Sequence, residues 1–326
     1  MPILRGDDPA AVATAAARLA EGGLVGLPTE TVYGLGARAD SDAAVAGIFQ
    51  AKGRPSEHPL IVHVADTSQA ATFAAKLPPA ALRLMQAFWP GPVTVIVPRA
   101  AGVAKASAGG QDSIGLRCPS HPVAQSLLRQ AAALGVPGVS APSANRFGRV
   151  SPTQAAHVVA EFGPELLVLD GGDCLVGIES TIVDCSRDHP VLLRPGLLTR
   201  ASLEAALGEP LLAPDGQAPR ASGTLASHYA PHARVRLWSG EALAAALDDR
   251  ARRPTGLAVY SRRAGFAGLG ALWRRMPDDP AAAAHELFAV LRQLDDPGVA
   301  EIWVEQPPED PAWEGVLDRL RRAAAG

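Results

Sequence analysis

Apolar residues recur along this chain with two different spacings, which together predict alternating strands and helices. Short, nearly continuous apolar runs, such as residues 60–64 and 93–98, are typical of buried strands. Apolar residues at helical spacing, preceded by a capping residue such as Ser41, predict helices. We expect strands at 24–27, 60–64, 93–98, 113–118, 166–170, 180–185 and 190–195, with a further strand beginning at 138, and helices from residue 7 or 8 to 21 and at 41–52, 79–88, 121–133, 153–161 and 200–207.

The order of these elements predicts an α/β fold with two domains. Several strands follow one another without a helix between them, so the first domain, residues 1–208, should contain a mixed sheet. Residues 209–232 are rich in proline and small residues and are interpreted as a linker, and loops of this length are usually functional or disordered. Strand and helix then alternate through 233–326, with helices expected at 240–250, at 280–294 and from residue 311, which predicts a smaller, Rossmann-like parallel sheet.

Length and composition narrow the class of protein. A chain of 326 residues that is 48% hydrophobic can fill two cores. Its formal charge of −3 argues against broad, non-specific binding to nucleic acid. The three cysteines have no zinc-ligand spacing, and the N-terminus lacks a signal pattern, so we expect a cytoplasmic, non-membrane protein.

The richest chemistry lies between residues 27 and 63. Thr29, Thr31 and Tyr33 could hydrogen-bond a small polar ligand, and Gly34 and Gly36 would let backbone approach it closely. Lys52 and Arg54 could hold an anion, although cations are also common at the end of a helix. No Walker-type loop or GxGxxG is present, so phosphates would have to be held by side chains and loop amides.

Further candidates lie where later strands begin or end. Arg117 could offer its planar fork to a carboxylate or form only a surface ion pair, and Arg194 poses the same question. Loops at 140–145 and 179–181 carry serines, but no GxSxG elbow supports a serine hydrolase. His63 lies in an apolar strand, where a histidine is more often a core residue than a catalyst, and Tyr229 lies in the linker, where it could pack or close over a ligand.

Seven motifs in order make the chain resemble the Sua5/YrdC family of threonylcarbamoyl-AMP synthases. They are PTETVYGLG with KGRP, HPLIVH, SIGLRCP, SAPSAN, GIESTIVD and LLRPG, and they span essentially the whole first domain. The linker with SHYAPH and the trailing domain resemble the long, two-domain Sua5 form rather than the single-domain YrdC form. The resemblance implies a YrdC-like first domain with a twisted mixed sheet.

The resemblance also implies an activity. Such enzymes are nucleotidyltransferases that condense L-threonine, bicarbonate or CO2 and ATP into threonylcarbamoyl-adenylate and pyrophosphate, with Mg²⁺ accompanying ATP. A separate transferase complex then modifies adenosine 37 of tRNA, so weak tRNA binding at most is expected. The linker would act as a lid over ATP.

Carried over by motif, the resemblance assigns site residues. It leaves the magnesium ligands unspecified, and the growing charge on the pyrophosphate leaving group would be neutralised by Lys52, Arg54, Arg194 and a magnesium ion. His58 stands where some relatives carry asparagine. L-threonine would be held by Thr31, His63, Arg117, Ser140, Ala141 and Ser180, and ATP by Lys52, Arg54, His58, Ser113, Ser143, Ser151, Arg194 and Tyr229.

Two other functions remain open from the sequence. An RNA-binding module is one, but the acidic charge and the scarcity of aromatics (5%) disfavour it. A carbamoyl-transfer domain like that of hydrogenase maturation proteins is the other, but its zinc-finger-like and acylphosphatase segments are not visible here.

Overall fold

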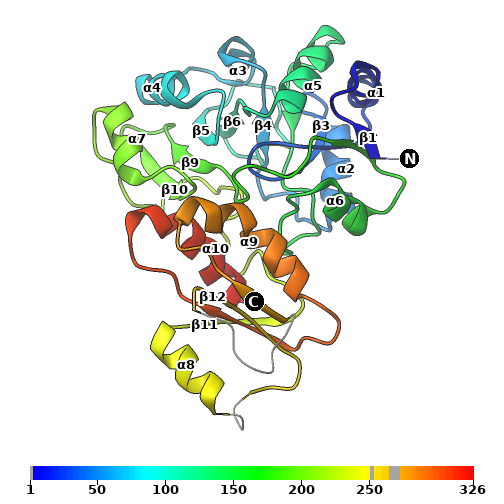
Figure 1. The fold of residues 1–326 in the computed structure, drawn as a ribbon. Helices are drawn as coiled ribbons and strands as arrows, with labels where there is room; N and C mark the ends of the chain where they lie inside the picture. The colour runs from blue at the N-terminus through cyan, green and yellow to red at the C-terminus, as the bar shows by residue number, and fades with distance from the viewer. Residues whose placement is uncertain (1–2, 250–252, 264–271) are drawn as a thin grey trace. The chain divides into compact units, whose positions relative to one another are not determined.

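The computed structural model describes residues 3–249, 253–263 and 272–326 and divides into two compact units (Figure 1). The first contains Met1–Phe147 and Ser151–Thr224, and the second contains Gly148–Val150 and Leu225–Gly326. Residues 209–232, expected to be a linker, are therefore shared between the units.

A ten-stranded mixed sheet forms the first unit, in the order β1-β8-β2-β3-β7-β4-β6-β5-β9-β10. Parallel pairs such as β4 with β6 alternate with antiparallel pairs such as β5 with β6, which confirms the mixed sheet. The strands are β1 (Ile3–Arg5), β2 (Val25–Leu27), β3 (Gly34–Arg38), β4 (Ile61–His63), β5 (Val93–Pro98), β6 (Ser113–Arg117), β7 (Val139–Ser140), β8 (Leu167–Asp170), β9 (Thr181–Asp184) and β10 (Val191–Arg194).

Seven helices accompany this sheet within the described residues, and side-chain caps begin the first two. Asp8 accepts a hydrogen bond from the Ala10 amide (2.9 Å), and Ser41 accepts one from the Ala44 amide (3.3 Å). The helices are α1 (Pro9–Ala20), α2 (Asp42–Lys52), α3 (Thr67–Phe73), α4 (Pro79–Phe88), α5 (Pro122–Ala133), α6 (Ala155–Phe162) and α7 (Arg200–Leu207).

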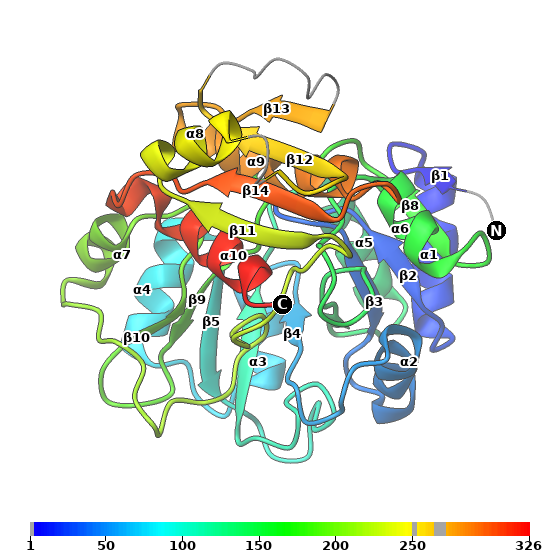
Figure 2. The ribbon, with the colours of Figure 1, turned by 90° about the horizontal axis from the view of Figure 1, so that it is seen from below.

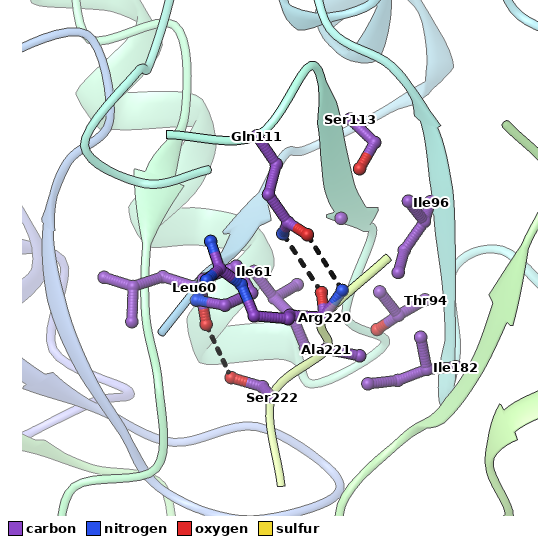
Figure 3. Close-up of a pocket in the computed structure, with 12 residues that line it drawn as sticks. Leu60, Ile61, Thr94, Ile96, Gln111, Ser113, Ile182, Arg220, Ala221 and Ser222 are labelled. Atoms are coloured by element: carbon purple, nitrogen blue, oxygen red, sulfur yellow. Dashed lines mark hydrogen bonds between the residues drawn. The ribbon is translucent and has the colours of Figure 1, made fainter. Parts of the chain in front are cut away.

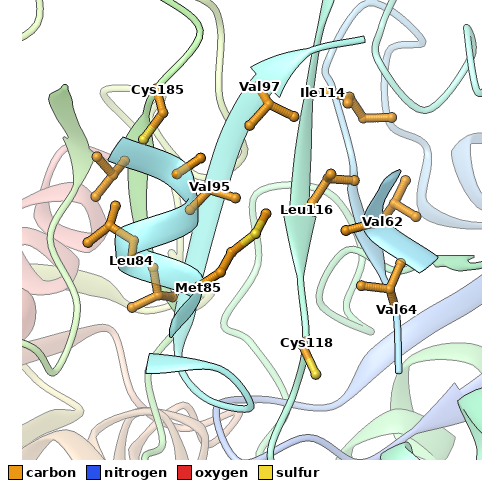
Figure 4. Packing of buried hydrophobic residues seen from close by; sticks show 14 of the residues in the cluster. Val62, Val64, Leu84, Met85, Val95, Val97, Ile114, Leu116, Cys118 and Cys185 are labelled. Carbon is orange, nitrogen blue, oxygen red and sulfur yellow. The ribbon is translucent and has the colours of Figure 1, made fainter. Parts of the chain in front are cut away.

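Helices α3, α4 and α7 cover one face of the strands at the β4–β9 side of the sheet. Leu84 and Met85 of α4 pack there against Val95 and Leu116, whose side chains share that face (Figure 4). Because strand residues alternate between faces, the intervening residues of β4, β5, β6 and β9 point to the opposite side. That opposite side carries the candidate site.

The second unit contains a four-stranded sheet in the order β11-β14-β12-β13 (Figure 2). Every strand pair in it is parallel, as the sequence predicted. Its elements are β11 (Arg234–Trp238), α8 (Gly240–Asp248), β12 (Leu257–Ser261), β13 (Trp273–Arg275), α9 (Pro280–Leu294), β14 (Glu301–Glu305), the 3-10 turn Pro311–Trp313 and α10 (Glu314–Ala324). Residue 250, the expected end of the helix at 240–250, lies outside the described residues.

None of the helices in the described ranges is long and apolar enough to cross a membrane.

Candidate functional site

Polar side chains converge on the sheet face opposite α4. Residues at alternate positions of β4, β5 and β6 share this face, and Gly115 lies among them. A Cβ built at Gly115 would lie 3.4 Å from Thr94 and 3.6 Å from Ile61, so the glycine leaves space above this part of the sheet that a side chain would fill. His63 and Arg117, two residues further along β4 and β6, are aligned in the strand register and lie on the same face.

Arg117 is buried at the end of β6 and is held on three sides. Its Nε donates to the carbonyl of Gly91 (3.3 Å), and its Nη1 donates to the hydroxyl of Thr31 (2.8 Å). Its Nη2 lies 2.8 Å from a carboxylate oxygen of Glu30. Arg117 is therefore not a surface ion pair but an oriented guanidinium inside the protein, as expected for a carboxylate-binding residue.

Glu30 is a component of this cluster that the sequence analysis did not single out. Its residue is only 4% exposed. Burial raises the pKa of its carboxyl, but the charge and hydrogen bonding of Arg117, together with the amides of Glu30 and Ser120, outweigh burial and bring that pKa below its usual value. Glu30 is therefore ionised at neutral pH and neutralises Arg117.

The hydroxyls of Thr29 and Thr31 form a hydrogen-bond chain with a fixed direction. Thr29 donates to the Val32 carbonyl (2.6 Å), so its oxygen must accept from Thr31, 2.9 Å away. Thr31 then donates to Thr29 while it accepts from Arg117. One lone pair of the Thr31 oxygen is left over, which could accept a hydrogen bond from a ligand.

His63 is neutral in this setting. Burial and the charge of Arg117 lower the pKa of its imidazole from 6.5 to about 3, although Glu30 opposes this effect. Among the described residues, its buried Nδ1 has no hydrogen bond of good geometry, although the backbone of Ile61 and Val139 lies close to the ring. A buried, unpartnered ring nitrogen costs free energy in the folded protein, which fits a site that a ligand's polar group would complete better than it fits a core histidine.

Ser140 and Ala141 lie beside β4. The Ser140 hydroxyl pairs with the hydroxyl of Ser107 at 2.6 Å, and the Ala141 amide donates to the Ile61 carbonyl (3.0 Å). Ser107 had no signal in the sequence, because it comes from a loop that is far away along the chain.

Ser180 connects this cluster to Arg194. Its hydroxyl lies 2.8 Å from that of Thr94, and Arg194 reaches both the Ser180 carbonyl (3.0 Å, from Nε) and the Ser180 hydroxyl (3.2 Å, from Nη2). Arg194 also donates to the carbonyl of Ser222 (2.9 Å). The head of Arg194 is thus inside the protein, on the same side of the sheet as Thr94.

Lys52 is the most deeply buried cation of the predicted nucleotide group. Its Nζ donates to the carbonyl of Ser143 (2.6 Å) and to that of Asn145. Burial and the charge of Arg54 lower the pKa of its amine well below the usual value, against the opposing charges of Glu161 and Glu179. In this structure Lys52 shapes the 143–145 loop.

Arg54 lies beside the loop that follows α2. Its Nη2 donates to the Pro59 carbonyl (2.9 Å) and the Ser222 hydroxyl (3.2 Å), and its guanidinium lies over the ring of Phe147 at 5.6 Å. His58 packs edge-on against the same ring, 5.3 Å between centroids. The structure therefore brings Arg54 and His58 together at the ring of Phe147.

Three serines were expected at the nucleotide. Ser151 is buried and donates a short hydrogen bond to a carboxylate oxygen of Glu179, Ser143 supplies the carbonyl that binds Lys52, and Ser113 lines a small pocket. Each of these serines thus has its own surroundings in the first unit.

Part of the expected linker covers the Ser113 pocket, whose cavity is about 10 Å³ (Figure 3). Gln111 binds the backbone of Arg220 twice, accepting from its amide (2.8 Å) and donating to its carbonyl (3.1 Å). Ser222 donates to the Pro59 carbonyl (2.9 Å). A cavity this small holds about one water, so a nucleotide could enter only if this segment moved.

Tyr229 lies in the second unit. Its ring packs against Phe288 (5.3 Å between centroids), and the guanidinium of Arg319 lies over its ring at 5.5 Å. Its φ of 60° is unusual for a residue with a side chain. The structure therefore places the Tyr229 ring among these side chains of the second unit, and its role at ATP stays a prediction.

Two expectations about the 27–36 segment were wrong. The Tyr33 hydroxyl donates to the Gly172 carbonyl (2.8 Å) and accepts from the Gly171 amide (3.1 Å), so it fastens β3 to the end of β8 rather than facing a ligand. A Cβ on Gly36 would lie 2.8 Å from Leu27, and one on Gly34 would lie 3.1 Å from Ala141. Both glycines allow close packing within the protein rather than approach to a ligand.

Candidate metal ligands are sparse in the part of the chain that the structure describes. No group of three or more His, Cys, Asp or Glu residues suited to a metal ion occurs among the described residues. The three cysteines, Cys118, Cys174 and Cys185, are buried and free.

Comparison with known proteins places this architecture in a family. Residues 17–196 match the family model for Sua5, YciO and YrdC, described as telomere recombination, and residues 198–325 match the threonylcarbamoyl-AMP synthase C-terminal domain. The chain belongs to the Sua5/YrdC family. Because the two models match consecutive parts of the chain, it is a member of the long, two-domain Sua5 form.

Relatives agree over nearly the full length. Threonylcarbamoyl-AMP synthase of Bacillus subtilis is 37% identical over 97% of this chain and 93% of its own. The synthase of Pyrococcus abyssi is also 37% identical, over 95% of this chain and 93% of its own. The crystal structure of P. abyssi Sua5 complexed with L-threonine matches with a TM-score of 0.89 and 34% identity, covering 99% of this chain and 97% of that one.

Proposed function

We propose that this protein is an L-threonylcarbamoyladenylate synthase. It condenses L-threonine, bicarbonate or CO2 and ATP into threonylcarbamoyl-adenylate and pyrophosphate, and the product serves tRNA modification at adenosine 37 through a separate transferase complex. The observation that carries the proposal is the buried Arg117 cluster on the same sheet face as Arg194. An oriented carboxylate-binding group and phosphate-binding cations therefore share one unit.

L-threonine is assigned to the cluster around Arg117. Its carboxylate would take the remaining N–H groups of the guanidinium, and its polar groups would find the acceptor site of Thr31 and the unpartnered Nδ1 of His63. Ser180 and the Ser140–Ala141 backbone border this cluster. The threonine complex of the P. abyssi relative supports L-threonine as the ligand.

ATP is assigned to the cations beyond Ser180. Arg54 and Arg194 at present bond to protein oxygens, and both bond to Ser222. Phosphate oxygens would replace such neutral partners with charged ones, which makes stronger hydrogen bonds. Lys52 would act by holding the 143–145 loop against the nucleotide, and His58 and Ser151 would border it.

Magnesium would accompany ATP, held mainly by its phosphates. Magnesium prefers oxygen ligands and is commonly bound by one or two carboxylates plus phosphates, so the absence of a larger acidic cluster among the described residues fits. The buried carboxylate of Glu179 and the hydroxyl of Ser151 are oxygen donors of the right kind. When bound, the metal would neutralise charge on the phosphates.

The chemistry requires a closed site. A carbamate is short-lived in water, so its oxygen must meet the α-phosphate in a pocket that excludes solvent. The segment Arg220–Ser222 lies over the pocket and bonds to two of the cations, which supports a lid role for residues 209–232.

RNA binding is the alternative of a different class. A net charge of −3 gives no general electrostatic attraction to tRNA, so tRNA binding should be weak at most.

Pyrophosphate release from ATP tests the proposal. Wild type should release it only when both L-threonine and bicarbonate are present. Arg117→Lys keeps the charge but loses the planar fork, so its KM for threonine should rise about 10- to 100-fold, since hydrogen bonds to charged groups contribute about 1.5–3 kcal/mol. The exposed Arg5→Lys is the matched control. Release without threonine, or no release at all alongside tight tRNA binding, would refute the proposal.

A further inference from the structure

The charge balance around Arg117 carries information about which ligands the site accepts. Glu30 supplies one negative charge and Arg117 one positive charge, joined at 2.8 Å. His63 faces both and is neutral at pH 7 because its pKa is lowered to about 3. His121, which also faces Glu30, has a pKa lowered by burial. The described part of this buried cluster therefore has a formal charge of zero before any ligand arrives.

A neutral buried cluster discriminates between ligand charges. A simple carboxylate would bring an uncompensated negative charge into the interior, which is costly. An α-amino acid brings a carboxylate and an ammonium together, so the cluster stays neutral with the ligand bound. Without Glu30, the cluster would instead be positive and best matched to a plain carboxylate.

The position of Glu30 suits an ammonium. Its carboxylate lies against the head of Arg117, and in an α-amino acid the ammonium is attached one carbon away from the carboxylate. A carboxylate on the free edge of Arg117 therefore places the ammonium within the range of about 4–6 Å over which opposite charges interact strongly. The guanidinium of Arg117 and the amides of Glu30 and Ser120 act on this carboxylate as donors. The carboxylate keeps accepting capacity, since an ionised carboxyl has about four lone-pair positions.

We propose that Glu30 is a specificity-determining residue that makes the Arg117 site select a zwitterionic α-amino acid over a plain carboxylic acid. This inference rests on the proposed function, because it takes the Arg117 cluster as the amino-acid site. Glu30 acts at the binding step, so its loss should raise the KM for threonine more than it lowers kcat. Glu30 would recognise the amine of the ligand, while the other residues of the site would recognise its carboxylate and its hydroxyl.

Calorimetry with two ligands tests the inference directly. The ligands are L-threonine and its α-hydroxy analogue, in which a hydroxyl replaces the ammonium and the net charge becomes −1. Wild type should bind threonine about 30- to 100-fold more tightly than the analogue, as expected for one charge-assisted contact. Glu30→Gln should bind threonine at least 10-fold more weakly and the analogue as tightly as wild type or more so, which collapses the preference.

Controls separate this role from a structural one. Glu30→Asp keeps the charge and should retain most of the preference, and the exposed Glu21→Gln should behave as wild type. If Glu30→Gln weakens both ligands equally, Glu30 only supports the shape of Arg117 and the inference is overturned.

Three further outcomes keep the test decisive. If Glu30→Gln does not fold, as judged from circular dichroism and loss of ATP binding, the test of the inference rests on wild type alone. Equal affinity of wild type for the two ligands then overturns the inference. A wild type that binds no threonine and releases no pyrophosphate contradicts the proposed function itself. An active wild type whose preference survives in Glu30→Gln contradicts only the inference.

Discussion

Replacing Lys52 with methionine should damage nucleotide binding and leave threonine binding almost intact. Lys52 is 2% exposed, and its amine donates to the carbonyls of Ser143 and Asn145. Methionine fills a similar volume but leaves both carbonyls without this donor. The Ser143 carbonyl keeps the amide of Asn145 as a donor (3.0 Å), so the cost is that of two lost hydrogen bonds, about 0.5–1.5 kcal/mol each, and the first unit should lose about 1–3 kcal/mol of unfolding free energy.

The loss should be selective because the two carbonyls belong to the loop assigned to ATP, whereas the threonine cluster centres on Arg117. We expect the Kd for ATP to rise at least 10-fold, and the Kd for threonine to change less than about threefold, both measured by calorimetry. Urea unfolding monitors the stability.

The chain offers a matched control, since its other two lysines, Lys76 and Lys105, are exposed. Lys76→Met should leave both affinities and the stability unchanged. The reasoning is refuted if Lys52→Met binds ATP like wild type, or if it loses threonine and ATP affinity to the same degree.

Three other changes probe separate parts of the site. The pKa of His63 is lowered from 6.5 to about 3, so between these pH values the folded state binds fewer protons than the unfolded state. The free energy of unfolding should therefore fall by about 2 kcal/mol between pH 6.5 and 5. In His63→Gln this loss should be absent, as measured by urea titrations. Thr94→Val removes the hydroxyl 2.8 Å from that of Ser180, so threonine affinity should fall about 3- to 10-fold by calorimetry. Gln111→Leu removes both bonds to the Arg220 backbone and should speed limited proteolysis of the covering segment.

Each of these changes has its own control. For the histidine it is the exposed His285→Gln, which should keep the wild-type pH slope; an unchanged slope in His63→Gln would contradict the account. For the threonine it is Thr14→Val in α1, and equal losses in the two variants would count against the role of Thr94. For the glutamine it is the exposed Gln50→Leu, and identical cleavage rates would show that Gln111 does not hold the segment.

Periodicity predicted much of the fold because the helices carry clear local signals. Helices α4 and α9 have the bounds predicted for them, and α9 begins with Asp279 capping the amide of Ala282 (2.7 Å). Strand β3 was missed: its sequence GLGAR has little strand propensity and is held by pairing with β2 and β7. The strand conformation of β3 therefore depends on tertiary pairing rather than on its local sequence.

The site was predictable only where chemistry stood out in the local sequence. Arg117 and His63 were found, and their strand register brings them together. The partners Glu30, Ser107 and Gln111 were not, since each gains its meaning from a contact with a segment distant in sequence or from burial. The reverse error occurred at Tyr33, whose polar hydroxyl is satisfied by the end of β8.

The most direct test of the central claim is to identify the product formed from ATP, L-threonine and ¹³C-labelled bicarbonate by mass spectrometry. The account predicts a threonylcarbamoyl-adenylate that is one mass unit heavier with the labelled carbon, formed together with pyrophosphate. A threonine adenylate without the labelled carbon, or ATP left unchanged, would contradict it.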